Sequence, residues 1–184
     1  MASQGPNLPS AAVNDAGVGS DSWSSLSSIY GLGSAFASGF ITLTTQYAKT
    51  TGYGFSIPSG ATITGIEVKF VGRVSTSSGT SGGIIQTAKI VKGGTITGTA
   101  QDTDNNILSA VSDVTVILGG SSNLWGTTWT DSDINASNFG VAISINATGG
   151  KFMDCGCNSI EITVYYTTGG GGGSSTNPIL YIGN

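Results

Sequence analysis

Hydrophobic and polar residues alternate along three segments of the chain, at residues 62–74, 139–145 and 160–166. In the first segment, Ile66, Val68 and Phe70 fall on one face and charged side chains fall on the other. Because the side chains of a strand alternate between two faces, each segment predicts a strand with one buried face. Weaker strands are expected at residues 40–45, 84–91 and 114–118.

Turn-forming residues separate these segments. Glycine, serine and proline gather at residues 58–60, 77–79, 93–94, 119–121 and 149–150. No window of a dozen residues has a helical hydrophobic stripe, although residues 107–112 could form one helical turn. Short strands at this spacing, without helices to bridge parallel pairs, predict an all-β fold: one antiparallel β-sandwich or jelly-roll-like domain with extended N- and C-terminal arms.

The two ends of the chain differ in composition from the middle. Residues 1–20 are polar and contain Pro6 and Pro9, so we expect an N-terminal arm there, followed by the sandwich over residues 21–168. Residues 169–175 form a Gly/Ser linker with five consecutive glycines, which no side chain helps to order. Residues 176–184 are expected to form a C-terminal docking peptide.

The docking peptide supplies the candidate partner-binding residues, which are Asn177, Pro178, Ile179, Leu180, Tyr181 and Ile182. Burial of its four large apolar side chains would contribute about 6–10 kcal/mol before the cost of ordering the peptide. The simplest way to bury them is to add a strand to an exposed sheet edge.

Charged residues make up only 9% of the 184 residues, and the net charge is −4. The cations are scattered, whereas binding to a nucleic acid needs a cluster of them along its backbone. No apolar run approaches the ~18 residues of a membrane span, and the N-terminal segment lacks the features of a secretory signal. We therefore expect neither nucleic acid nor membrane as a partner, and synthesis in a cytoplasm.

Metal and cofactor sites find little support in the sequence. Cys155 and Cys157 would share one face of a strand, and the chain has no histidine or further cysteine to complete a metal site. We interpret them as reduced structural thiols, with a strained or intermolecular disulfide and metal ligation as alternatives. Residues 102–106 and 131–135 partly resemble the start of a calcium loop, but Ile107 stands where the first loop needs glycine. We interpret both as turns and expect no metal ion or cofactor.

We expect no enzyme. The absence of histidine removes the commonest general base and the usual nucleophile pairings. A glycosidase-like carboxylate pair could come from several residues, but no spacing selects among Asp131, Asp133, Asp154 and Glu161.

Trp125 and Trp129 stand four residues apart, so in an extended chain both rings would face the same side. Such a pair suits either a corner of the core or a platform on which a sugar stacks. We favour the core, because both residues lie beside predicted strands.

Taken together, several segments resemble a pattern found in tailed-bacteriophage virion proteins. They are Trp23 after Asn14-Asp15, residues 54–68, residues 124–126 with 130–141, and residues 162–167. The likeness covers roughly residues 14–168 and implies a β-sandwich displayed on the virion. The Cys155-Gly156-Cys157 turn and the glycine linker depart from the pattern, so the resemblance implies nothing about the tail.

The resemblance implies either of two roles. In the first, the chain is a capsid decoration (cement) protein that binds the major capsid protein or another virion protein and stabilises the capsid as a homo-oligomer, with a trimer favoured. In the second, it is a head- or tail-fibre module that binds a receptor or glycan, with Trp125 and Trp129 forming the site.

Overall fold

The computed structural model describes residues 1–76, 82–101 and 112–168. It contains strands and two short helical segments, all listed here in chain order: β1 (Ala2–Asn7), β2 (Ala11–Asp15), η1 (Leu26–Ile29), β3 (Tyr30–Thr44), β4 (Tyr47–Thr51), β5 (Thr62–Thr76), β6 (Gly82–Lys92), β7 (Thr95–Gln101), β8 (Val114–Gly120), α1 (Asp131–Asn135) and β9 (Gly140–Thr167). Within these ranges, no helix is long and apolar enough to cross a membrane.

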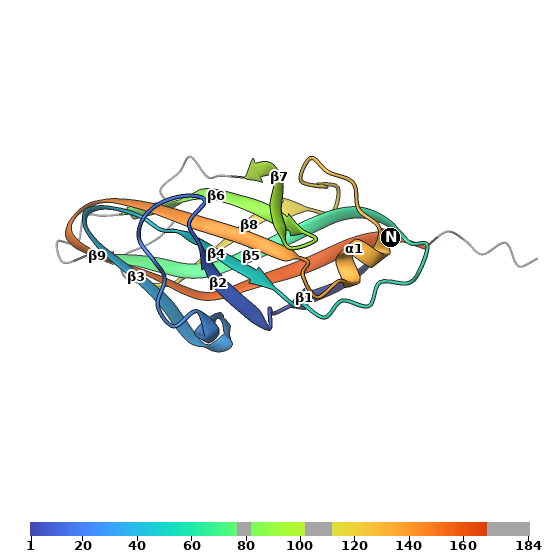
Figure 1. Ribbon diagram of the computed structural model, residues 1–184, viewed down its shortest axis with the longest axis horizontal. Helices are drawn as coiled ribbons and strands as arrows, with labels where there is room; N and C mark the ends of the chain where they lie inside the picture. The colour runs from blue at the N-terminus through green and yellow to red at the C-terminus, as the bar shows by residue number, and fades with distance from the viewer. Residues whose placement is uncertain (77–81, 102–111, 169–184) are drawn as a thin grey trace, which may run out of the picture.

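Strand β9 organises the fold. It is 28 residues long and bends, so that its first half lies in one sheet and its second half in the other (Figure 1). The first sheet has the order β2-β4-β9-β6-β7. In the second sheet, β5 and then β8 lie on one side of β9, while β3 and β1 lie on the other. All pairs are antiparallel and the two sheets pack as a sandwich, which confirms the expected all-β fold.

The glycine pair at residues 149–150 does not form the turn that the sequence predicts. Strand β9 continues through it, because β3 pairs with β9 on both sides of the pair, through Thr42 with Thr148 and Gly39 with Met153. The register shifts here, as it does at β-bulges, where glycine lets a strand bend without ending. By contrast, Gly93 and Gly94 form the predicted turn of the β6–β7 hairpin, both with positive φ.

Most of the segment expected as an N-terminal arm pairs with the sandwich. β1 joins the second sheet, where Ala2 lies opposite Tyr166 of β9, and β2 joins the first sheet, where Val13 lies opposite Lys49 of β4. These strands carry no clear hydrophobic alternation, so the pattern of the sequence does not indicate them.

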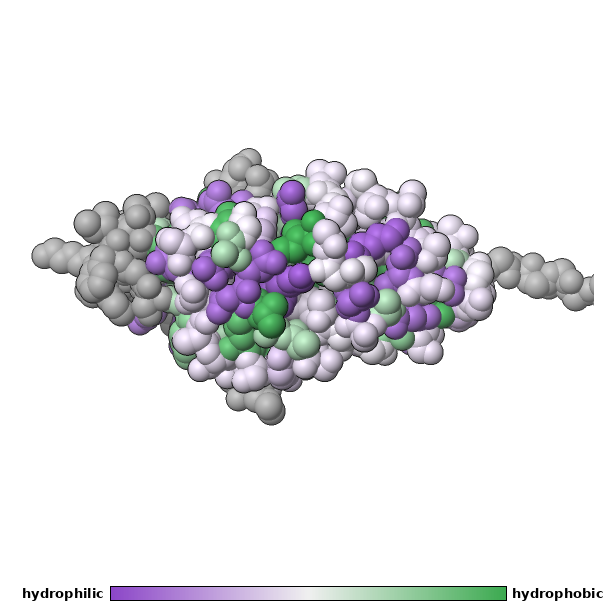
Figure 2. All heavy atoms as spheres, viewed as in Figure 1, coloured by the Kyte–Doolittle hydropathy of each residue, from purple (hydrophilic) through white to green (hydrophobic). Residues whose placement is uncertain are grey.

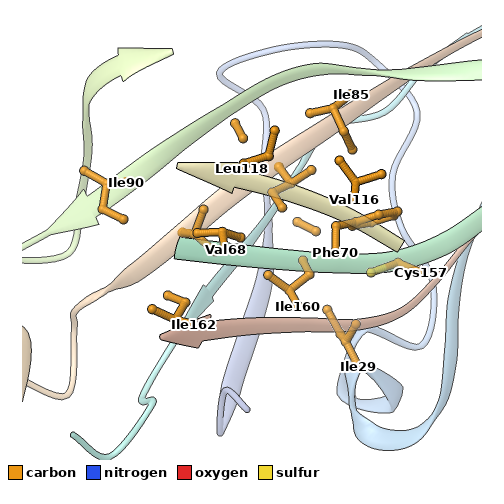
Figure 3. Packing of buried hydrophobic residues seen from close by; sticks show 14 of the residues in the cluster. Ile29, Val68, Phe70, Ile85, Ile90, Val116, Leu118, Cys157, Ile160 and Ile162 are labelled. Carbon is orange, nitrogen blue, oxygen red and sulfur yellow. The ribbon is translucent and has the colours of Figure 1, made fainter. Parts of the chain in front are cut away.

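The core lies between the two sheets, and alternate residues of β5, β8 and the second half of β9 contribute to it (Figure 3). Ile66, Val68 and Phe70 of β5 are fully buried, as the alternation predicts. They meet Ile160 and Ile162 of β9. Each large aliphatic or aromatic side chain buried in this way contributes roughly 1.5–3 kcal/mol relative to an exposed one.

Cys155 and Cys157 are free thiols on the core-facing side of β9, and both are buried. Burial raises the pKa of both thiols, and the neighbouring Asp154 raises that of Cys155 further. The interpretation as reduced structural thiols therefore agrees with the structure.

Both thiols should be protected from modification in the folded protein. Because the thiolate is the reactive form and burial suppresses it, a thiol reagent at neutral pH should label the native protein at least about tenfold more slowly than the denatured protein. The check is a time course of labelling by mass spectrometry, with and without denaturant. Equal labelling rates in the two states would contradict the burial of these side chains.

Candidate functional site

The proposed partner-binding residues Asn177, Pro178, Ile179, Leu180, Tyr181 and Ile182 lie outside the described residues. The described chain ends at Thr168, directly after β9. At this end of the sandwich β1 begins, with Ala2 opposite Tyr166, and the bend of β9 lies at the far end (Figure 1). Met1 and Thr168 therefore leave the sandwich at the same end.

Trp125 belongs to the core and forms no surface platform. Its side chain is fully buried, and its Nε1 donates a hydrogen bond to the Ile66 carbonyl at 3.0 Å. The Oδ1 of Asn123 accepts from the Trp125 backbone N–H at 2.8 Å and fixes the turn from which the ring enters the core. With no exposed ring face, Trp125 cannot stack on a sugar, and the core interpretation is the correct one.

Trp129 is half-buried at the edge of the same core. Its ring packs edge-on against Phe139 at a centroid distance of 5.4 Å, and its Nε1 donates to the Leu124 carbonyl at 3.0 Å. The ammonium of Lys92 lies 5.3 Å from the ring centroid. The two rings do not face the same side because the chain between the two tryptophans is not extended: Trp125 and Gly126 have φ of 58° and 68°.

The acidic cluster at residues 131–135 forms helix α1, not a calcium loop. Thr130 and Asp133 make a capping box, in which each side chain accepts a hydrogen bond from the other's backbone N–H. Asp133 also pairs with Lys92, with 3.0 Å between Nζ and Oδ2. The Oδ2 atom of Asp133 thus already receives donors from Thr130 and Lys92. In the described ranges no three metal-ligating side chains cluster; residues 102–106 lie outside them.

Asp133 should make the stability of the fold sensitive to acid. Burial raises its pKa, but hydrogen bonds from Thr130 and Lys92 outweigh burial and leave the pKa below its usual 3.8. The carboxylate therefore stabilises the fold above its unfolded pKa, and this contribution is lost as the pH falls through the folded value.

We expect Asp133→Asn to lower the melting temperature at about pH 7 and to have a smaller effect at about pH 2.5, where a larger fraction of the wild-type carboxyl is protonated. Thermal unfolding followed by circular dichroism at both pH values checks this. Ser132→Ala, at an exposed position of the same helix, is the matched control and should change neither value. An equal loss for Asp133→Asn at both pH values would contradict the assigned role of the charge.

A shallow groove crosses the outer face of the β2-β4-β9-β6-β7 sheet. It consists of two hollows of about 450 and 240 Å³ that share Lys49 and Gly94. The view in Figure 2 shows green hydrophobic patches interrupted by purple hydrophilic surface. Tyr47, Val91 and Ala142 form a small buried cluster under this face.

The groove carries a local positive charge on an acidic protein. The Lys49 ammonium donates to the Gly94 carbonyl at 2.6 Å and lies 3.9 Å from the Asp15 carboxylate. Lys89 also lines the groove and forms no ion pair with another described residue. Ammonium groups above an apolar floor suit binding of a surface ligand, and sequence reasoning missed them because they come from different strands.

A second candidate surface is the outer edge of β8, at the border of the second sheet. Among the described strands, β8 pairs only with β5. Its side chains alternate between the core and solvent, and Ile117 is 51% exposed. An unpaired strand edge offers backbone donors and acceptors to another strand.

Comparison with known proteins does not place the chain in a family: no family model matches it, and neither a curated protein nor a solved structure is significantly similar to it.

Proposed function

We propose that this protein is a structural component of a tailed-bacteriophage particle, a decoration protein that binds the capsid surface and is held there through its C-terminal tail. The observation that carries the proposal is the origin of the tail. The glycine linker begins after Thr168, and this residue directly follows β9, with which β1, β3, β4, β5 and β6 all pair. A force applied to the tail would therefore be shared by the strands of both sheets, because all five pair with β9.

The arrangement of the two ends supports the same role. Met1 and Thr168 leave the sandwich at one end, so both ends of the described chain are available for contacts there, while the bend of β9 lies at the opposite end. A sandwich fold alone hosts many functions. The phage resemblance and the tail, not the fold, point to a virion.

The proposed partner is the major capsid protein or another virion protein, and the proposed assembly is a trimer. Symmetric oligomers present identical copies of one surface. Once one tail of such an oligomer is bound, the others are held near their sites at high effective concentration, so weak tails together give tight attachment. Neither nucleic acid nor membrane is part of the proposal.

The number of copies per particle tests this role. Quantitative mass spectrometry of purified phage particles should find the protein in many copies, at a fixed ratio to the major capsid protein. A few copies per particle would instead support the alternative of a fibre or tail-appendage module. Absence from the particles would contradict both virion roles.

A further inference from the structure

The edges of the two sheets are not equally open to a further strand. At β2, the side chain of Asn14 bonds both the N–H and the carbonyl of Trp23 at 2.8 Å. At β7, the N–H of Thr99 donates to the Trp125 carbonyl at 2.7 Å. For residues 114–119 of β8, the described residues supply strand pairing on the β5 side only.

The core beneath β8 is nearly but not completely covered. Val116 and Leu118, which point inward, keep 6% and 5% of their surface exposed, whereas Val68 and Phe70 of the neighbouring β5 keep 0%. On the outer face, Ile117 is 51% exposed. Every second side chain of a further strand along this edge would cover Val116 and Leu118. The remaining side chains of that strand would lie beside Ile117 on the outer face.

The sequence of the tail fits such a strand. Residues 179–182 are Ile, Leu, Tyr and Ile, of which the two isoleucines and the tyrosine favour strands. Pro178 precedes them at a position where a missing N–H costs an added strand little, and Gly183 follows them. We propose that the outer edge of β8 accepts residues 179–182 of a second copy of this chain as an added strand. This inference rests on the proposed function and refines it: the tail holds the protein on the particle by linking neighbouring subunits, so residues 179–182 contact a second copy and not the capsid protein.

The end of β8 favours a second copy over the tail of the same chain. There the turn after Gly120 closes over β5: the N–H of Asn123 donates to the Gly120 carbonyl at 3.1 Å, and the N–H of Ile66 donates to the Asn123 carbonyl at 2.9 Å. This turn stands between Thr168 and the free edge.

The linker allows the tail to reach well beyond the end of its own β9. Residues 169–176 span about 14–17 Å as a coil and about 28 Å when extended. Within one chain, the new position lies three strand spacings from β9, about 14 Å away, before the detour around the turn is added. A tail that crosses to a subunit in contact needs no such detour.

Four full-length proteins test the proposal by light scattering after gel filtration over a range of concentrations. They are the wild type, Ile117→Lys at the edge, Leu180→Asp with Ile182→Asp in the tail, and Val13→Lys as the control. Val13 is 56% exposed on β2 and matches Ile117 in size class, strand context and exposure. The melting temperature of each variant verifies that it is folded.

We expect the wild type and Val13→Lys to self-associate, and the edge and tail variants to be monomers. A 1:1 mixture of the edge and tail variants should form dimers, since one chain keeps a working tail and the other a working edge. Amide exchange over residues 114–120 should be at least about tenfold slower in the wild type than in the tail variant.

Three results would overturn the proposal. The first is a wild type that stays monomeric at every concentration. The second is a monomeric mixture with exchange protection of β8 that does not depend on concentration, which would assign the tail to its own chain. The third is self-association that both variants leave unchanged. Attachment to phage particles, measured separately, can succeed or fail in each case, so failure of this contact and failure of the virion role are distinguishable.

Discussion

Replacing Trp125 with alanine is expected to destabilise the protein by about 3–5 kcal/mol, a large part of the stability of an ordinary domain. The substitution empties a fully buried site and leaves the Ile66 carbonyl without its indole donor. Chemical denaturation followed by far-ultraviolet circular dichroism measures the change without relying on tryptophan fluorescence.

Trp129→Ala is the matched comparison. The Trp129 ring is only half-buried, and its removal costs the contacts with Phe139 and Lys92 and the hydrogen bond to the Leu124 carbonyl, so we expect a smaller loss of about 1–2 kcal/mol. Equal costs for the two substitutions, or a Trp125→Ala variant as stable as the wild type, would show that Trp125 does not fill the core.

Gly140→Ala is expected to be the second most damaging substitution, at about 3 kcal/mol or more. A Cβ at this first residue of β9 would lie 1.8 Å from the carbonyl oxygen of Thr50 in β4. Because that oxygen belongs to the backbone of the paired strand, relief requires β4 and β9 to separate.

Gly156→Ala on the same strand provides the control. Its Cβ would meet the side chains of Phe36 at 3.5 Å and Arg73 at 3.7 Å, both of which are ordinary contacts. We expect it to cost less than about 1 kcal/mol. Denaturation of both variants under identical conditions is the measurement, and a Gly140→Ala protein no less stable than Gly156→Ala would contradict the close approach of β4 to β9.

The hydrophobic pattern predicts the fold class because the sandwich buries one face of most strands. It predicts β5 and both halves of β9 for this reason. It does not reveal that β9 is continuous, since Gly149-Gly150 is compatible with a turn and with a bend, and only pairing with β3 decides between them. The hydrophobic pattern does not predict β1 and β2, because neither strand has a periodic apolar face. Pairing with β9 and β4, which are distant in sequence, holds them in place.

The candidate surfaces are less visible in the sequence than the fold. The groove joins Lys49 of β4 with Lys89 of β6, and the register of β9 between them sets their proximity. The interpretation that Trp125 and Trp129 face the same side assumed an extended chain, which the positive φ of Trp125 and Gly126 rules out. The sequence does contain an indication of helix α1, the Thr130–Asp133 capping box. The comparison of residues 131–135 with a calcium loop drew attention away from it.

The most direct test of the proposed role is deletion of residues 169–184 from the protein in the phage that encodes it. All strands of the described structure precede this segment, so the shortened protein is expected to keep its circular dichroism spectrum and its melting temperature. Its occupancy on purified particles, measured by quantitative mass spectrometry against the major capsid protein, should fall to background. Wild-type occupancy by the shortened protein would contradict attachment through the tail.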